Sequence, residues 1–255
     1  WQAPWRHPMT STHKAQVDNP DSSLPAILSR SIVKNKPYIV SEINESFPSD
    51  YMAECMPLCA AYALLQDWDG FFWHSYTGGH FGWNDIWQEQ AIKHHLRIAT
   101  DPVRMSQMAI GALMFLRGDV RAARDLIERT VPYEWALDSL RVSAPDTAHC
   151  YWLPYLSQRA SLVHRIALAD MHADAVRPGE GEVALPAGSI VSDTGELTWE
   201  DAPGDGRVLI DAPRHQGVIM RAGERATAHM RVTLATRFAA IQLASLDDRP
   251  VAESG

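Results

Sequence analysis

The chain has no excess of basic residues. Its 23 lysines and arginines are outnumbered by 31 aspartates and glutamates among 255 residues, which gives a formal net charge of −8. The basic residues are scattered and form no run. Because a nucleic-acid partner needs a basic surface that neutralises phosphates, this balance argues against nucleic acid as a partner. No stretch of about 18 uninterrupted apolar residues occurs either, so the sequence predicts no membrane span.

Cysteine is also scarce, with three residues, Cys55, Cys59 and Cys150. Cys55 and Cys59 lie four residues apart in a stretch with helical character, so both would face the same side of one helix. A disulfide along one helix has poor geometry, and a metal site would need more ligands nearby. We therefore predict buried free thiols, which do not identify a cellular compartment.

No histidine pair has the spacing of a metal site. A metallopeptidase helix carries two histidines four residues apart with an acid beside them, and that pattern is missing here. His94 and His95 are adjacent and would point to different sides of a helix. We therefore expect no catalytic metal and no cofactor. The histidines considered are His7, His13, His74, His80, His94 and His95.

Residues 192–195 read Ser-Asp-Thr-Gly, and Asp-Thr-Gly occurs in aspartic proteases, where two aspartates share a proton. A second copy of the motif is missing from the sequence. The motif also stands between short strand-like runs, so we interpret residues 192–195 as a turn.

Short apolar runs alternate with helical patterns in the first half of the chain. Residues 36–42 form a compact apolar run with no polar alternation before Ser41, and residues 71–76 form a second run. A strand that is apolar on both faces belongs to a parallel sheet covered by helices. Apolar residues at helical spacing follow, over residues 51–65 and 102–116. This order predicts βα units of an α/β barrel.

The pattern changes after Gly118. Residues 119–180 have no clear periodicity, whereas residues 182–243 contain short strand-like runs separated by turn residues. This spacing predicts an antiparallel β-sandwich or small barrel. We expect residues 1–118 to be the C-terminal part of the α/β barrel and residues 119–255 to be a β-sandwich-like accessory domain. Because no Gly/Ser/Pro linker separates them, we expect the two regions to contact each other through apolar surface.

The ends of the two predicted parallel strands carry the candidate chemistry. Glu42 ends the first strand, and Trp73, His74 and Tyr76 lie at the end of the second. In an α/β barrel, the carboxyl ends of the strands hold the catalytic groups. A carboxylate beside aromatic rings is typical of a sugar site, because the acid reacts at the glycosidic bond while a ring packs on the sugar.

These segments resemble a known family. Residues 36–44, then Phe47-Pro48 and residues 66–76, are similar to strands seven and eight of clan A glycoside hydrolases, in particular of cellulase-like, family-five-related proteins. Residues 192–199 and 210–214 resemble the β-rich region that follows the barrel in such proteins. The resemblance implies a (β/α)8 barrel with Glu42 as the catalytic nucleophile and Trp73 at the subsite where the bond is cut.

The candidate substrate-binding residues are Trp73, Asn44, Tyr76, His80 and Trp83. For Glu42 the alternative is a strand-end carboxylate in a structural ion pair. For Trp73 the alternative is core packing, and for the other four residues it is loop scaffolding.

The expected function is therefore hydrolysis of β-linked glycans by a retaining double displacement. The family places its acid/base glutamate at the end of strand four, which has no counterpart here. We thus expect the chain to be part of a larger protein, completed by a missing N-terminal barrel portion or by an oligomer partner. The alternative function is a non-catalytic carbohydrate-binding or protein-interaction module. A secreted or periplasmic location would suit the enzyme, and the sequence leaves this open.

Overall fold

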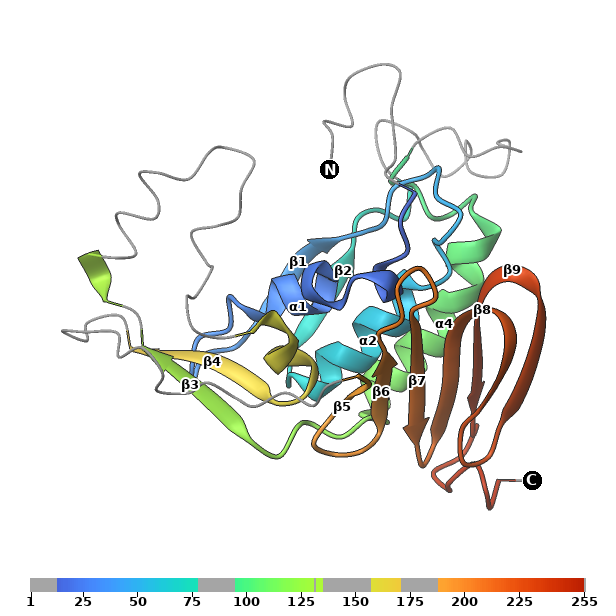
Figure 1. Ribbon diagram of the computed structural model, residues 1–255. Coiled ribbons are helices and arrows are strands. Elements are labelled where there is room, and N and C mark those ends of the chain that lie inside the picture. Colours follow the sequence, from blue (N-terminus) through green and yellow to red (C-terminus); the bar gives the residue numbers. More distant parts are fainter. Residues whose placement is uncertain (1–12, 78–94, 131, 135–156, 171–187, 255) are drawn as a thin grey trace.

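The computed structural model describes residues 13–77, 95–130, 132–134, 157–170 and 188–254. Two helices, α2 (Cys55–Leu65) and α4 (Pro102–Arg117), lie between a two-stranded parallel sheet and a five-stranded antiparallel sheet (Figure 1). Buried side chains of α2 contribute to the cores on both sides. No described helix is long and apolar enough to cross a membrane.

The first sheet pairs β1 (Ile39–Ile43) with β2 (Gly70–Trp73) in parallel. The predicted parallel pairing of these neighbouring strands is therefore confirmed. The connecting helix α2 begins at Cys55, later than the predicted start at residue 51. Pro57 lies in its first turn, where a missing N–H group costs no helical hydrogen bond. Ten of the eleven residues of α2 are buried, including the two free cysteines Cys55 and Cys59, as predicted. Cys150 lies outside the described residues.

Helix α4 follows the prediction closely and has defined caps at both ends. The Asp101 carboxylate accepts hydrogen bonds from the backbone N–H groups of Val103 and Arg104 at the N-terminus. Gly118 ends the helix with φ of 64°, a left-handed conformation that favours glycine. The capped helix covers Pro102–Arg117, which is one residue longer than the predicted range 102–116.

The second sheet has the order β5–β6–β7–β8–β9, and every neighbouring pair is antiparallel. In β7, buried residues alternate with half-buried ones, as expected for a sheet with one face on the core. Strand β9 is longer than the short runs expected from the sequence, with 14 residues. Strands β5 to β9 form one sheet packed on helices, and among the described residues no second antiparallel sheet faces it as in a sandwich. The strand bounds are Ile190–Val191 (β5), Leu197–Glu200 (β6), Arg207–Ala212 (β7), His215–Ala226 (β8) and Arg231–Ala244 (β9).

A second parallel pair, β3 (Leu126–Thr130) and β4 (Arg165–Asp170), lies in the region that the sequence left unassigned. An isolated parallel bridge joins Val33 to Leu168 at its edge. The remaining described elements are short: η1 (Gln16–Asp18), η2 (Pro20–Ser22), α1 (Leu24–Ser29) and η4 (Gln158–Leu162).

One apolar core crosses the boundary predicted at residues 118 and 119. It joins α2, α4, the N-terminal segment and the five-stranded sheet, so the two regions contact each other through apolar surface, as expected. Trp199 of β6 is fully buried in this core. Its ring packs on Tyr62 of α2, and its indole N–H donates to the Val17 carbonyl oxygen at 2.9 Å. Trp199 therefore connects sheet, helix and N-terminal segment.

Trp199→Phe should lower the free energy of unfolding by about 1–3 kcal/mol, because the buried Val17 carbonyl loses its hydrogen-bond donor. Urea denaturation followed by circular dichroism measures the change. Leu243→Ala, at a position 41% exposed on β9, is the control and should stay within about 0.5 kcal/mol. Equal effects of the two substitutions would contradict the central place of Trp199.

Candidate functional site

Glu42 lies near the carboxyl end of β1 and faces solvent. Its side chain is 65% exposed, while the neighbouring residues Ile43 and Asn44 are buried. Among the residues that the structure describes, the only basic side chain near its carboxylate is His74, with Nε2 at 3.9 Å from Oε1. No described arginine or lysine therefore holds Glu42 in a structural ion pair, and its oxygens remain accessible to a ligand.

Trp73 ends β2 directly beside this position, since Ile43 and Trp73 are paired residues of the parallel sheet. Its ring is half-buried and packs against Phe71 on the side of α2. The indole N–H donates to the sulfur of Met56 at 2.9 Å. Trp73 thus has core contacts that leave only part of its ring for a ligand. Tyr76 is 44% exposed further along the same segment.

Asn44 is buried and acts as a connector, which agrees with the scaffolding alternative. Its amide nitrogen donates to the backbone oxygens of His74 and Leu96. Its amide oxygen accepts from the guanidinium of Arg104 at 3.0 Å. Asn44 therefore joins the end of β1 to the end of β2 and fixes the spacing between Glu42 and His74.

Arg104 of α4 is the centre of this connection. Its Nε donates to Asp101 Oδ2 at 2.6 Å, and both side chains are buried. Its Nη1 donates to Asn44 and to the Glu45 carbonyl, and its Nη2 donates to the Arg97 carbonyl at 2.6 Å. Each guanidinium nitrogen has a partner, so the buried charge is compensated. We refer to Asp101, Arg104 and Asn44 as the strand-end clamp.

Two carboxyl groups lie close to the clamp, the partly buried Glu45 and the fully buried Glu54. Glu54 is fully buried and accepts from the backbone N–H groups of Gln16 and Val17, while Glu45 accepts from the Ser49 hydroxyl. Burial raises the pKa of Glu54 well above its usual value, and the nearby Glu45 charge raises it further. Burial also raises the pKa of Glu45. Their placement under the N-terminal segment assigns them a structural role.

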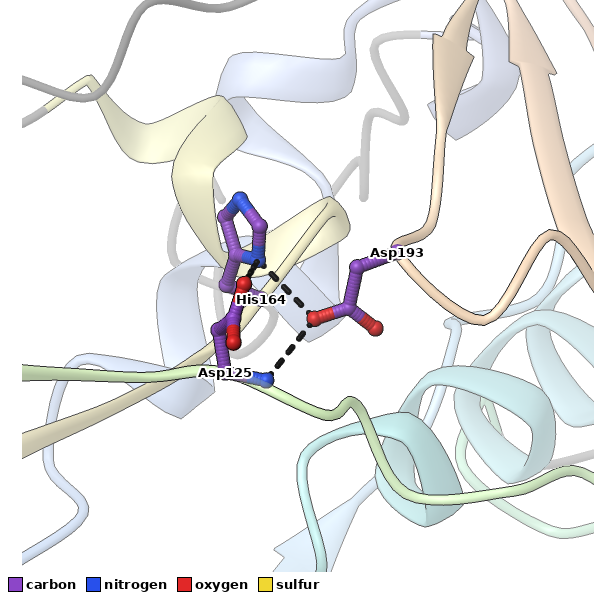
Figure 2. A group of neighbouring side chains, drawn as sticks. All are labelled: Asp125, His164 and Asp193. Atoms are coloured by element: carbon purple, nitrogen blue, oxygen red, sulfur yellow. Dashed lines mark hydrogen bonds and ion pairs between the residues drawn. The ribbon is translucent and has the colours of Figure 1, made fainter.

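A separate group of possible metal ligands consists of Asp125, His164 and Asp193, drawn in Figure 2. They precede β3, precede β4 and follow β5, respectively. Asp125 and His164 belong to no sequence motif, and the sequence predicts only a turn at Asp193. It does lie in the turn between β5 and β6, as predicted. Residues so far apart in the chain form no local motif, so only the fold reveals the group.

The structure brings Glu42, Trp73 and Asn44 together, with Tyr76 nearby in the chain. His80 and Trp83 lie outside the described residues. His74 was expected at the strand end but not among the binding residues. Of the described basic side chains, it is the one that approaches the Glu42 carboxylate.

Comparisons of the chain with models of known protein families, with curated proteins and with solved structures find no match.

Arg104→Met should lower the free energy of unfolding by about 3–5 kcal/mol, because it leaves the buried Asp101 carboxylate without its cation. Chemical denaturation measures this loss. Arg249→Met is the matched control, since Arg249 pairs with Asp247 in an exposed turn, and it should cost about 0.5 kcal/mol or less. A small loss for Arg104→Met would refute the clamp.

The raised pKa of Glu54 predicts a pH-dependent stability. A carboxyl group with a raised folded pKa stabilises the fold fully below its unfolded pKa, near 4.5, and loses this contribution as pH rises through the folded pKa. Glu54→Gln, which is neutral at every pH, should therefore gain stability relative to the parent as pH rises from about 4.5. Unfolding curves across this range test the slope. An offset between the two proteins that stays constant with pH would contradict the prediction, and the exposed control Glu253→Gln should leave the slope unchanged.

Proposed function

We propose that this chain is the C-terminal part of a cellulase-like (β/α)8-barrel glycoside hydrolase that cleaves β-linked glycans with retention, using Glu42 as nucleophile. The observation that carries this proposal is the position of Glu42, an exposed carboxylate with no described arginine or lysine partner, at the carboxyl end of a parallel strand. The adjacent strand ends in Trp73 and His74 at the same edge of the sheet.

The chemistry assigned to Glu42 needs an ionised and accessible carboxylate. In a double displacement, a carboxylate oxygen attacks the anomeric carbon, the leaving oxygen takes a proton from an acid, and water then cleaves the glycosyl ester. Glu42 meets the requirement of access, because its side chain is 65% exposed. The partly exposed ring of Trp73 beside it offers an apolar face to a sugar.

The acid/base carboxyl group is assigned to another part of the barrel. A retaining pair needs its two carboxyl groups about 5–5.5 Å apart. Glu45 is the next carboxylate along the chain, but it lies on the same loop as Glu42, and its oxygens accept hydrogen bonds from the side chains of Ser49 and Gln16. Glu45 therefore stabilises the loop after β1. The acid/base residue is proposed to come from a strand outside these 255 residues.

An exposed apolar face on the small parallel sheet supports the proposal that further barrel strands pack against it. Val40 and Phe71 face α2, whereas Ile39 and Phe72 on the opposite face are 53% and 60% exposed. Parallel sheets normally have both faces buried. In a closed barrel, the face opposite the helices is the packed interior, so further strands would cover Ile39 and Phe72.

The test uses 2,4-dinitrophenyl 2-deoxy-2-fluoro-β-glycosides, whose leaving group needs no proton, so that the nucleophile is probed without its acid partner. Mass spectrometry of the chain, incubated with a panel of such sugars, should find one glycosyl group on the peptide that holds Glu42. Glu42→Gln should abolish the label, and the exposed control Glu253→Gln should retain it.

Two results would contradict this function. A label on another residue, unchanged in Glu42→Gln, would overturn the nucleophile assignment. Saturable glycan binding without any covalent label would favour the non-catalytic binding module instead.

A further inference from the structure

We propose that Asp125, His164 and Asp193 bind a divalent transition-metal ion such as Zn²⁺. The bound ion would tie three separate segments together, the start of β3, the start of β4 and the turn between β5 and β6. This site is independent of the function proposed for Glu42, because it lies on other elements and uses other side chains.

The three side chains converge with the spacing of ligands around one ion. Figure 2 shows the Nδ1 side of the His164 ring turned toward both carboxylates. Nδ1 lies 2.9 Å from Asp193 Oδ2 and 3.7 Å from Asp125 Oδ2, and one donor atom of each residue lies within 4.8 Å of the others. Donors at about 2.0–2.2 Å from a tetrahedral zinc ion stand about 3.3–3.6 Å apart. Small side-chain adjustments would therefore place all three donors on one ion.

The charges also favour a cation over a simple hydrogen-bonded group. Two carboxylates approach one imidazole nitrogen, and within the described ranges neither has a lysine or arginine partner. One N–H on Nδ1 can serve Asp193 at 2.9 Å, but it leaves Asp125 at 3.7 Å without a good hydrogen bond. A divalent ion can bind both carboxylates and the ring nitrogen at once.

Asp193 is already held in a ligand's position. The backbone N–H groups of Arg124 and Asp125 each donate to its carboxylate at 3.0 Å, which is the type of support that fixes metal-binding carboxylates.

The backbone of His164 is fixed as well. Its N–H donates to the Ala160 carbonyl at 2.9 Å, and its carbonyl oxygen accepts from the side chain of the buried Gln66. The Asp193 backbone N–H donates to the Val163 carbonyl at 3.0 Å, which holds the turn against this segment. His164 and Asp193 are thus pre-positioned as ligands. Only the side chain of Asp125, which is 75% exposed, must change its conformation to bind the ion.

The donor types indicate the class of metal. An imidazole nitrogen with carboxylate oxygens suits Zn²⁺, Co²⁺ or Mn²⁺ better than Mg²⁺ or Ca²⁺, which prefer all-oxygen sites. Three protein donors leave at least one coordination position for water. We therefore choose Zn²⁺ as the probe and Co²⁺ as its spectroscopic substitute.

The test titrates the chelator-treated full chain with ZnCl2 by isothermal titration calorimetry and follows the midpoint of thermal unfolding. One saturable site is expected, with a midpoint that rises with the Zn²⁺ concentration because the ion binds the folded chain. Co²⁺ should give a visible absorption band that saturates at one equivalent.

Asp125→Asn and His164→Gln should each weaken Zn²⁺ binding about 10-fold or more. Asp125→Asn removes a ligand from an exposed side chain, so the metal-free thermal midpoint should not change. His164→Gln keeps an N–H that can donate to Asp193. His229→Gln is the matched control at an exposed histidine and should bind Zn²⁺ like the parent. The absence of a saturable site, or equal affinities in the parent, Asp125→Asn and His164→Gln, would overturn the proposal.

Discussion

The buried guanidinium of Arg104 is the constraint around which the candidate site is organised. A buried cation is costly unless its N–H groups are matched, and here Asp101 supplies the counter-charge while Asn44 and three backbone carbonyl groups supply acceptors. Those acceptors belong to the loop after β1 and to the segment before α4. Because the one rigid guanidinium group donates hydrogen bonds to both segments, the loop after β1 and the segment before α4 cannot move independently. Asn44 extends the same network to the carbonyl of His74 at the end of β2.

Three consecutive residues at the end of β1 have different roles, because two of them support the fold and one is available to a ligand. Ile43 and Asn44 are buried and hold the strand ends together, whereas Glu42 points to solvent with no described arginine or lysine partner. An exposed charge on a rigid strand end contributes little to stability, and it is pre-positioned for a ligand. Helix α2 completes the frame, because its buried side chains reach the parallel pair on one side and the antiparallel sheet on the other. The position of Glu42 thus depends on the packing on both sides of α2.

The sequence predicts the features that have local causes. Apolar residues at helical spacing mark α4, apolar runs mark β1 and β2, and short runs between turn residues mark the antiparallel strands. It misses what depends on distant contacts. The strand β3 pairs with β4 although their sequences carry no strong alternation, and Trp73 contacts Met56 because α2 packs beneath it. Asn44 looks like a binding residue in the sequence, but Arg104, 60 residues later, makes it a connector. His164 and Asp193, 29 residues apart, meet only through the fold.

The central claim is that Arg104 and Asn44 act together to fix the two strand ends. A double-mutant cycle tests it most directly, with the free energy of unfolding measured for the parent, Asn44→Ala, Arg104→Met and the double variant. Residues within one hydrogen-bonded network show coupling energies of about 0.5–3 kcal/mol, whereas independent sites add to within about 0.3–0.5 kcal/mol. We predict a coupling of about 1 kcal/mol or more between these two side chains, which lie 3.0 Å apart. Additive effects of the two substitutions would contradict the account.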